Sequence, residues 1–156
     1  MNYPFAFYTS HCQFYIFDKD APTESDLITI WTKEAHSDRL IVGKIILVAI
    51  TECYGPVRGE LNLVENANND LSLDEYDNIV EAGLEVKSGI IQILDCPTNG
   101  VHLELTVIPG IYRARIYSSN LASVVGDEGE DFYKVEIWPG TTLERRVLKR
   151  FSRAGQ

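Results

Sequence analysis

Ser10, His11 and Cys12 are the neighbouring side chains whose types suggest covalent chemistry. A hydroxyl or thiol nucleophile needs a histidine base within hydrogen-bonding distance. Successive side chains of a strand point to opposite faces, so neither nucleophile is expected to share a face with His11. The sequence therefore predicts no catalytic residue here, and we expect the protein not to be an enzyme.

Metal and cofactor sites are predicted to be absent as well. His11, His36 and His102 form no pair at the four-residue spacing that zinc sites on helices use. Residues 127–131 carry the oxygen ligands that calcium favours but lack the ordered alternation of an EF-hand loop, so calcium stays an open alternative there. Glycine-rich phosphate loops are missing, and no nucleotide cofactor is expected.

The charge balance excludes some partners. The 14 Lys and Arg residues against 23 Asp and Glu residues give a net charge of −9. Nonspecific attraction to nucleic acid or to an anionic membrane is therefore not expected, whereas a cationic partner is. The alternative is that the acidity only keeps the protein in solution. Residues 144–156 reverse the sign, and we expect this basic tail to be solvated or paired internally.

Length and cysteine content indicate the class of protein. A chain of 156 residues is expected to form one domain with a basic C-terminal tail. No uninterrupted apolar run reaches the 18 residues of a membrane span. The three cysteines form no C-x-x-C pair and are predicted to stay reduced, and residues 1–12 contain no signal-peptide core. The expected location is the cytoplasm.

Alternation of apolar and polar residues predicts a mainly β protein, an antiparallel β-sandwich. Residues 101–107 and 112–117 both alternate and flank Pro109 and Gly110, which predicts a hairpin. By the same logic, a turn at Ser88 and Gly89 joins two further strands. Other expected strands are residues 12–18, 45–51, 61–65 and 133–137.

One short helix is predicted over residues 27–39, where Leu27, Ile28, Trp31 and Ala35 recur at helical spacing after a cap at Ser25 or Asp26. We expect Trp31 to pack this helix against a sheet. Two polar stretches, residues 65–78 and 126–131, are predicted to be surface loops.

Several short elements occur in an order that resembles a known family. His11 to Asp20 is followed by Trp31-Thr32-Lys33-Glu34-Ala35, then by Val86 to Ile93, by Pro109-Gly110-Ile111-Tyr112 and by Asp131-Phe132-Tyr133. This series resembles the competence protein J family over residues 10–138. The chain departs from that pattern in residues 65–78, in residues 127–131 and in the tail.

The resemblance implies a small β-rich inhibitor that binds and silences a DNA-entry nuclease and has no direct nucleic-acid contact. Carboxylates would then imitate phosphates in a cationic cleft, around an aromatic anchor. The alternative is a non-catalytic binding or immunity-like module for another protein or small ligand, and homo-oligomerisation stays open. The candidate partner-binding residues are Asp127, Glu128, Glu130, Asp131, Asp70, Asp74, Glu75, Asp77, Tyr117 and Trp138.

Overall fold

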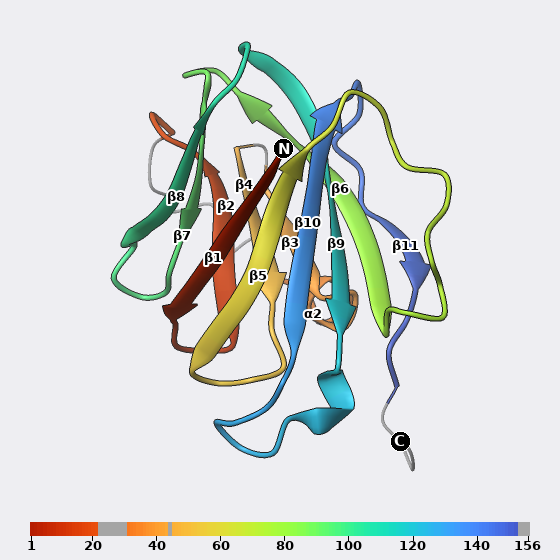
Figure 1. The fold of residues 1–156 in the computed structure, drawn as a ribbon. Coiled ribbons are helices and arrows are strands. Elements are labelled where there is room, and N and C mark those ends of the chain that lie inside the picture. The colour runs from red at the N-terminus through yellow and green to blue at the C-terminus, as the bar shows by residue number, and fades with distance from the viewer. Residues whose placement is uncertain (22–30, 44, 153–156) are drawn as a thin grey trace.

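The protein consists of two β-sheets packed face to face (Figure 1). The structure, a computed structural model, describes residues 1–21, 31–43 and 45–152. The predicted mainly β sandwich is confirmed. The strands are β1 (Asn2–Tyr8), β2 (Gln13–Asp18), β3 (Leu40–Val42), β4 (Ile46–Ile50), β5 (Pro56–Leu63), β6 (Asn78–Val86), β7 (Ile90–Leu94), β8 (Val101–Thr106), β9 (Gly110–Ser119), β10 (Phe132–Pro139) and β11 (Arg146–Lys149).

The first sheet has the order β1-β5-β10-β9-β6-β11, and the second has the order β3-β4-β2-β7-β8. Among the described strands, all pairs are antiparallel except β5 and β10, which run parallel in the first sheet. The parallel pair places the start of β10 beside the start of β5, so the loops that precede both strands lie at the same end of the sandwich.

The core lies between the sheets, where the inward side chains of both form one cluster. Phe5 and Phe7 of β1 meet Phe14 of β2 across it, with ring centroids 5.7 and 6.1 Å from Phe14. A second cluster covers the outer face of the second sheet, and Trp31 packs against it as expected. Burying large aromatic side chains contributes about 1.5–3 kcal/mol each to the stability of such a core.

The predicted hairpin between residues 101–107 and 112–117 is wrong. β8 pairs with β7 in the second sheet, whereas β9 pairs with β10 and β6 in the first. The turn at Pro109 and Gly110 therefore carries the chain from one sheet to the other. The turn at Ser88 and Gly89 does the same between β6 and β7. A hairpin and a crossing between sheets have the same alternation and the same turn residues. Only the strands to which each one is hydrogen-bonded distinguish the two.

The predicted short helix near residues 27–39 is confirmed, although the described helix covers only part of that range. Residues 27–30 and the proposed caps Ser25 and Asp26 lie outside the described residues. The described helix is α2 (Lys33–Ser37), and Thr32 before it is extended, with its side chain accepting a hydrogen bond from the backbone N–H of Ala35. This cap starts the helix where the apolar spacing suggested its middle.

The basic tail is paired internally where the structure describes it. β11 forms an edge strand on β6, and the side chains of Arg145 and Arg150 both bind Asp38 beside α2. Burial raises the pKa of Asp38, but the hydrogen bonds and charges of these two arginines outweigh that effect and leave the pKa below its ordinary value. No helix in the described part of the chain is long and apolar enough to cross a membrane.

Candidate functional site

Three connections meet at the lower end of the sandwich in Figure 1, which we call the loop end. They are residues 9–12 between β1 and β2, residues 51–55 between β4 and β5, and residues 120–131 between β9 and β10. Backbone hydrogen bonds join the first two, from Thr9 N to Gly55 O at 2.9 Å and from Thr51 N to Cys12 O at 2.9 Å. The loop end therefore brings together segments that are far apart in the sequence.

A buried hydrogen-bond network attaches the long loop 120–131 to residues 51–55. The Tyr133 hydroxyl donates to Asp131 Oδ2 at 2.6 Å and accepts from the backbone N–H of Glu52 at 2.7 Å. The backbone N–H of Cys53 also donates to Asp131, at 3.3 Å. Asp131 is only 3% exposed, so this predicted contact residue is an internal anchor and not part of the surface.

Cys53 supplies a second attachment, because its thiol donates to the backbone oxygen of Asp127 at 2.9 Å. Burial raises the pKa of the Cys53 thiol, and the nearby Asp131 and Asp127 raise it further. The thiol therefore keeps the proton that it donates. Outside the network, Arg58 donates to the oxygen of Gly129 at 2.9 Å, and the N–H of Glu130 donates to the Ser123 hydroxyl at 2.8 Å. The loop is held along its whole length.

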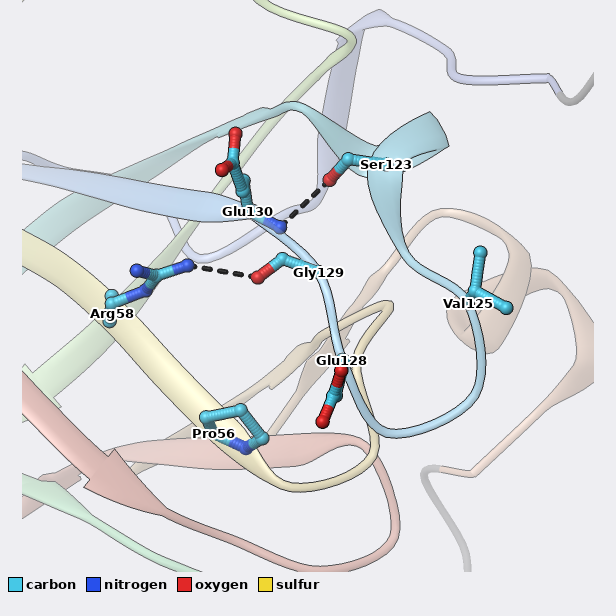
Figure 2. A pocket seen from close by; sticks show the side chains of 7 residues that line it. All are labelled: Pro56, Arg58, Ser123, Val125, Glu128, Gly129 and Glu130. Atoms are coloured by element: carbon cyan, nitrogen blue, oxygen red, sulfur yellow. Dashed lines mark hydrogen bonds between the residues drawn. The ribbon is translucent and has the colours of Figure 1, made fainter.

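The carboxylates of Asp127, Glu128 and Glu130 form the exposed edge of this loop, and we call them the acidic rim. In the described part of the chain, none of the three takes part in a salt bridge. Figure 2 shows Glu128 and Glu130 beside a shallow hollow of about 690 Å³. Pro56, Arg58 and Val125 also line this hollow. The rim thus offers negative charge that the described chain leaves unpaired.

Exposed apolar side chains lie next to the acidic rim. Tyr8 is 78% exposed, Tyr54 is 48% exposed and Val125 is 81% exposed. Tyr8 pairs with Pro56 in the β1–β5 register, and a Cβ on Gly55 would lie 3.7 Å from the Tyr8 ring. Pro56 and Val125 line the same hollow. These three side chains were missed in the sequence, although the outward position of Tyr8 follows from the alternation of β1.

The second predicted patch lies on the segment between β5 and β6, residues 64–77, which runs the length of the first sheet (Figure 1). Asp70, Asp74 and Glu75 are exposed there, whereas Asp77 is half-buried and accepts a hydrogen bond from the N–H of Leu121 at 2.9 Å. Cationic side chains of the first sheet contact the backbone of this segment. Arg115 donates to the backbone oxygen of Asn68 at 2.7 Å, and Lys149 donates to that of Leu73. The negative charge of this patch is therefore partly offset.

Beneath that segment lies a covered layer of charged and aromatic side chains on the outer face of the first sheet, which we call the charge layer. Glu81 binds Arg113 at 3.3 Å and Arg115 at 3.2 Å. The guanidinium of Arg115 lies 5.0 Å from the centroid of the Trp138 ring. The members of the charge layer are Glu81, Arg113, Arg115, Tyr117, Lys134, Glu136 and Trp138.

The two predicted anchors belong to the charge layer and are not on the surface. Tyr117 is 1% exposed and Trp138 is 7% exposed. Burial raises the pKa of Tyr117 strongly, and its hydrogen bond to Glu136 adds to the rise. Neither ring can reach a partner in this structure. The strand alternation placed both on the polar face correctly, but that face is covered by residues 64–77 and by the chain after β10.

The chain after β10 covers the charge layer with its backbone. Arg113 donates to the backbone oxygens of Thr142 at 3.2 Å and Glu144 at 2.7 Å. The N–H of Gly83 donates to the oxygen of Leu143 at 3.1 Å, and a Cβ at Gly83 would lie 2.1 Å from the oxygen of Thr142. Only glycine allows this approach, so the cover depends on a residue without a side chain.

The histidines and cysteines do not assemble into a metal centre in the described part of the chain, where no three His, Cys, Asp or Glu side chains are grouped to hold an ion. His102 lies 2.7 Å from Asp95 and stacks on Phe7 with ring centroids 4.3 Å apart. His11 is exposed in the β1–β2 connection. Neither histidine lines the hollow of Figure 2.

Comparison with known proteins yields a class of fold. No family model matches the chain, and no curated protein is similar to it in sequence. Two solved structures share its architecture. ComJ from Bacillus subtilis, an inhibitor of the DNA degrading activity of NucA, superposes with a TM-score of 0.66 and 18% identity, covering 88% of this chain and 95% of ComJ. A protein described as crocagin biosynthetic gene J superposes with a TM-score of 0.59 and 16% sequence identity. The match covers 90% of this chain and 98% of that protein.

The fold is therefore that of ComJ over nearly its whole length, and the resemblance found in the sequence is confirmed at the level of fold. At 18% identity, the likeness establishes the architecture and not a shared partner. ComJ itself is an inhibitor protein.

Proposed function

We propose that this protein is a stoichiometric inhibitor of a cationic nuclease of the DNA-entry type, acting in the cytoplasm without chemistry of its own. The observation that carries the proposal is the fold shared with ComJ, an inhibitor of the DNA degrading activity of NucA. A nuclease must present positive charge to hold DNA, and a protein of net charge −9 is suited to occupy the same surface.

The distribution of charge supports this proposal. Much of the basic tail is engaged by Asp38 and by β6, so it does not cancel the carboxylates at the loop end. The unpaired carboxylates of the acidic rim are spaced along one ordered loop, where they can substitute for the phosphates of a nucleic-acid strand. A reducing cytoplasm agrees with three free cysteines.

The test is an inhibition titration with NucA of Bacillus subtilis as the probe. Increasing amounts of the protein are added to a fixed amount of the nuclease, and DNA degradation is followed at low and at moderate salt. The proposal expects degradation to fall to a plateau near one equivalent of inhibitor. Unchanged degradation at tenfold excess in both salts would reject the inhibitor function and favour the binding or immunity-like module.

A further inference from the structure

We infer that the loop end is the docking surface, and that its partner is a basic protein surface with Lys or Arg side chains around an exposed apolar spot. This inference rests on the proposed function but selects between the two acidic regions of the chain. The surface consists of Tyr8, Tyr54 and Val125 at its centre and of the acidic rim at its edge.

Exposed apolar side chains form the centre of this surface. Tyr8 and Val125 are among the most exposed large apolar side chains of the described residues, and the side chain of Tyr54 is about half exposed. Tyr8 ends β1, Tyr54 lies in residues 51–55 and Val125 lies in residues 120–131. Tyr8 pairs with Pro56, its ring lies beside Gly55, and Pro56 and Val125 line the hollow of Figure 2. Protein interfaces concentrate binding energy in aromatic side chains surrounded by a polar rim. This arrangement occurs at the loop end.

Charge decides which acidic region fits a cationic partner. The acidic rim has Arg58 beside it, but that side chain donates to the backbone oxygen of Gly129 and forms no salt bridge with the three carboxylates. Residues 64–77, by contrast, lie on Arg115, Lys134 and Lys149. These cations repel a positive surface that approaches residues 64–77, so the net electrostatic attraction of such a partner is weaker there than at the acidic rim.

The surface is also rigid. The loop 120–131 is attached through Tyr133, Asp131 and Cys53 to the loop that carries Tyr54. The three carboxylates and the apolar centre are therefore held in a fixed relation before a partner arrives. Preorganised surfaces lose less conformational entropy on binding, which favours affinity. Asp131 and Tyr133 act here as positioning residues.

The first experiment measures the affinity of variants for NucA of Bacillus subtilis by calorimetry at low salt. Asp127→Asn, Glu128→Gln and Glu130→Gln combined should weaken binding about tenfold to a hundredfold, mainly through slower association. Tyr8→Ala should weaken it about tenfold. The matched control combines Asp70→Asn, Asp74→Asn and Glu75→Gln, and it should change the affinity less than threefold. Ile108→Ala, which truncates an exposed side chain outside the loop end, is the control for Tyr8→Ala.

The outcomes separate the two proposals. Loss of affinity in the control triple but not in the rim triple overturns the docking surface and leaves the inhibitor function standing. Binding that depends on the rim but does not slow DNA degradation overturns the inhibitor function and leaves the docking surface standing. Absence of any binding by the wild-type protein overturns the inhibitor function.

A second experiment tests the surface without a nuclease. The peptide acetyl-Lys-Trp-Lys-amide is titrated into ¹⁵N-labelled protein, and amide chemical shifts are recorded. Shifts should concentrate at residues 8, 54 and 125–130 and should disappear in the rim triple. Shifts concentrated at residues 70–77, or none at the loop end with millimolar peptide, would overturn the docking surface.

Discussion

The acidic rim and the charge layer both contain carboxylates, but these are used in opposite ways. In the charge layer, Glu81 lies between two arginines and is covered by backbone from two segments. In the acidic rim, the carboxylates have no cationic partner in the described chain and face solvent. Charge that is paired and covered holds the fold together, whereas charge that is held rigidly and left unpaired is available to a partner.

The comparison also explains why the obvious aromatic anchors are not the useful ones. Trp138 is the larger ring, but it stacks on Arg115 under cover. Tyr8 and Tyr54 are smaller, yet they are exposed at the loop end, which also carries the acidic rim. Whether an aromatic ring can contact a partner therefore depends more on which segments cover it than on the type of ring.

The largest effect that would test this contrast is expected in the charge layer. Glu81→Gln leaves Arg113 and Arg115 buried without their shared carboxylate, and it should lower the free energy of unfolding by about 3 kcal/mol. Chemical denaturation measures it. Glu128→Gln is the matched control at the rim and should change stability by no more than about 0.5 kcal/mol. Equal effects of the two substitutions would contradict the contrast.

The next largest effect is expected where the rim is attached to the sandwich. Tyr133→Phe removes the hydroxyl that joins Asp131 to the N–H of Glu52, and it should cost about 1–3 kcal/mol of stability. Tyr8→Phe removes an exposed hydroxyl and should leave stability unchanged. If thermal unfolding shows no difference between the two variants, the buried network does not hold the loop.

A smaller effect with a pH signature is expected at Asp38. Its folded-state pKa lies below the ordinary value because Arg145 and Arg150 outweigh burial. The stabilisation is therefore present above the unfolded-state pKa of about 3.9 and is lost as the pH falls through the folded-state value. Asp38→Asn should cost about 1–2 kcal/mol at pH 7.

The check for Asp38 is denaturation at several pH values. The difference between wild type and Asp38→Asn should shrink steadily below about pH 4. A difference that stays constant down to pH 2 would mean that the carboxylate charge does not contribute.

The smallest change in stability is expected for the rim triple. Neutralising Asp127, Glu128 and Glu130 together should leave the thermal midpoint within a few degrees, since none has a salt bridge to lose in the described chain. A large loss of stability would place the rim with the charge layer, and the affinity measurements on that variant would then report unfolding.

Much of the local structure could be read from the sequence. The alternation in residues 112–117 and 133–137 identified two neighbouring strands and the face to which each side chain points. The acidic break at 126–131 was correctly placed between them, and residues 64–77 do connect two strands. The site was predicted less well, since Asp131, Tyr117 and Trp138 proved to be buried.

Those errors have one physical origin. Alternation states which side chains leave the core, but it does not state whether another segment covers them. Arg113, Arg115 and Tyr117 alternate as a solvent-exposed face would, yet residues 64–77 and the chain after β10 cover that face.

By itself, the sequence determined the composition of the surface, the class of fold and the period of each strand, because these depend on side chains close together in the chain. Only the tertiary structure decided which strands pair, that β8 and β9 belong to different sheets, and that Tyr8 pairs with Pro56, which lines one hollow with Val125, Glu128 and Glu130. Backbone hydrogen bonds between strands are alike whatever the side chains. The choice of neighbour is therefore made by packing the whole core, which no local pattern contains.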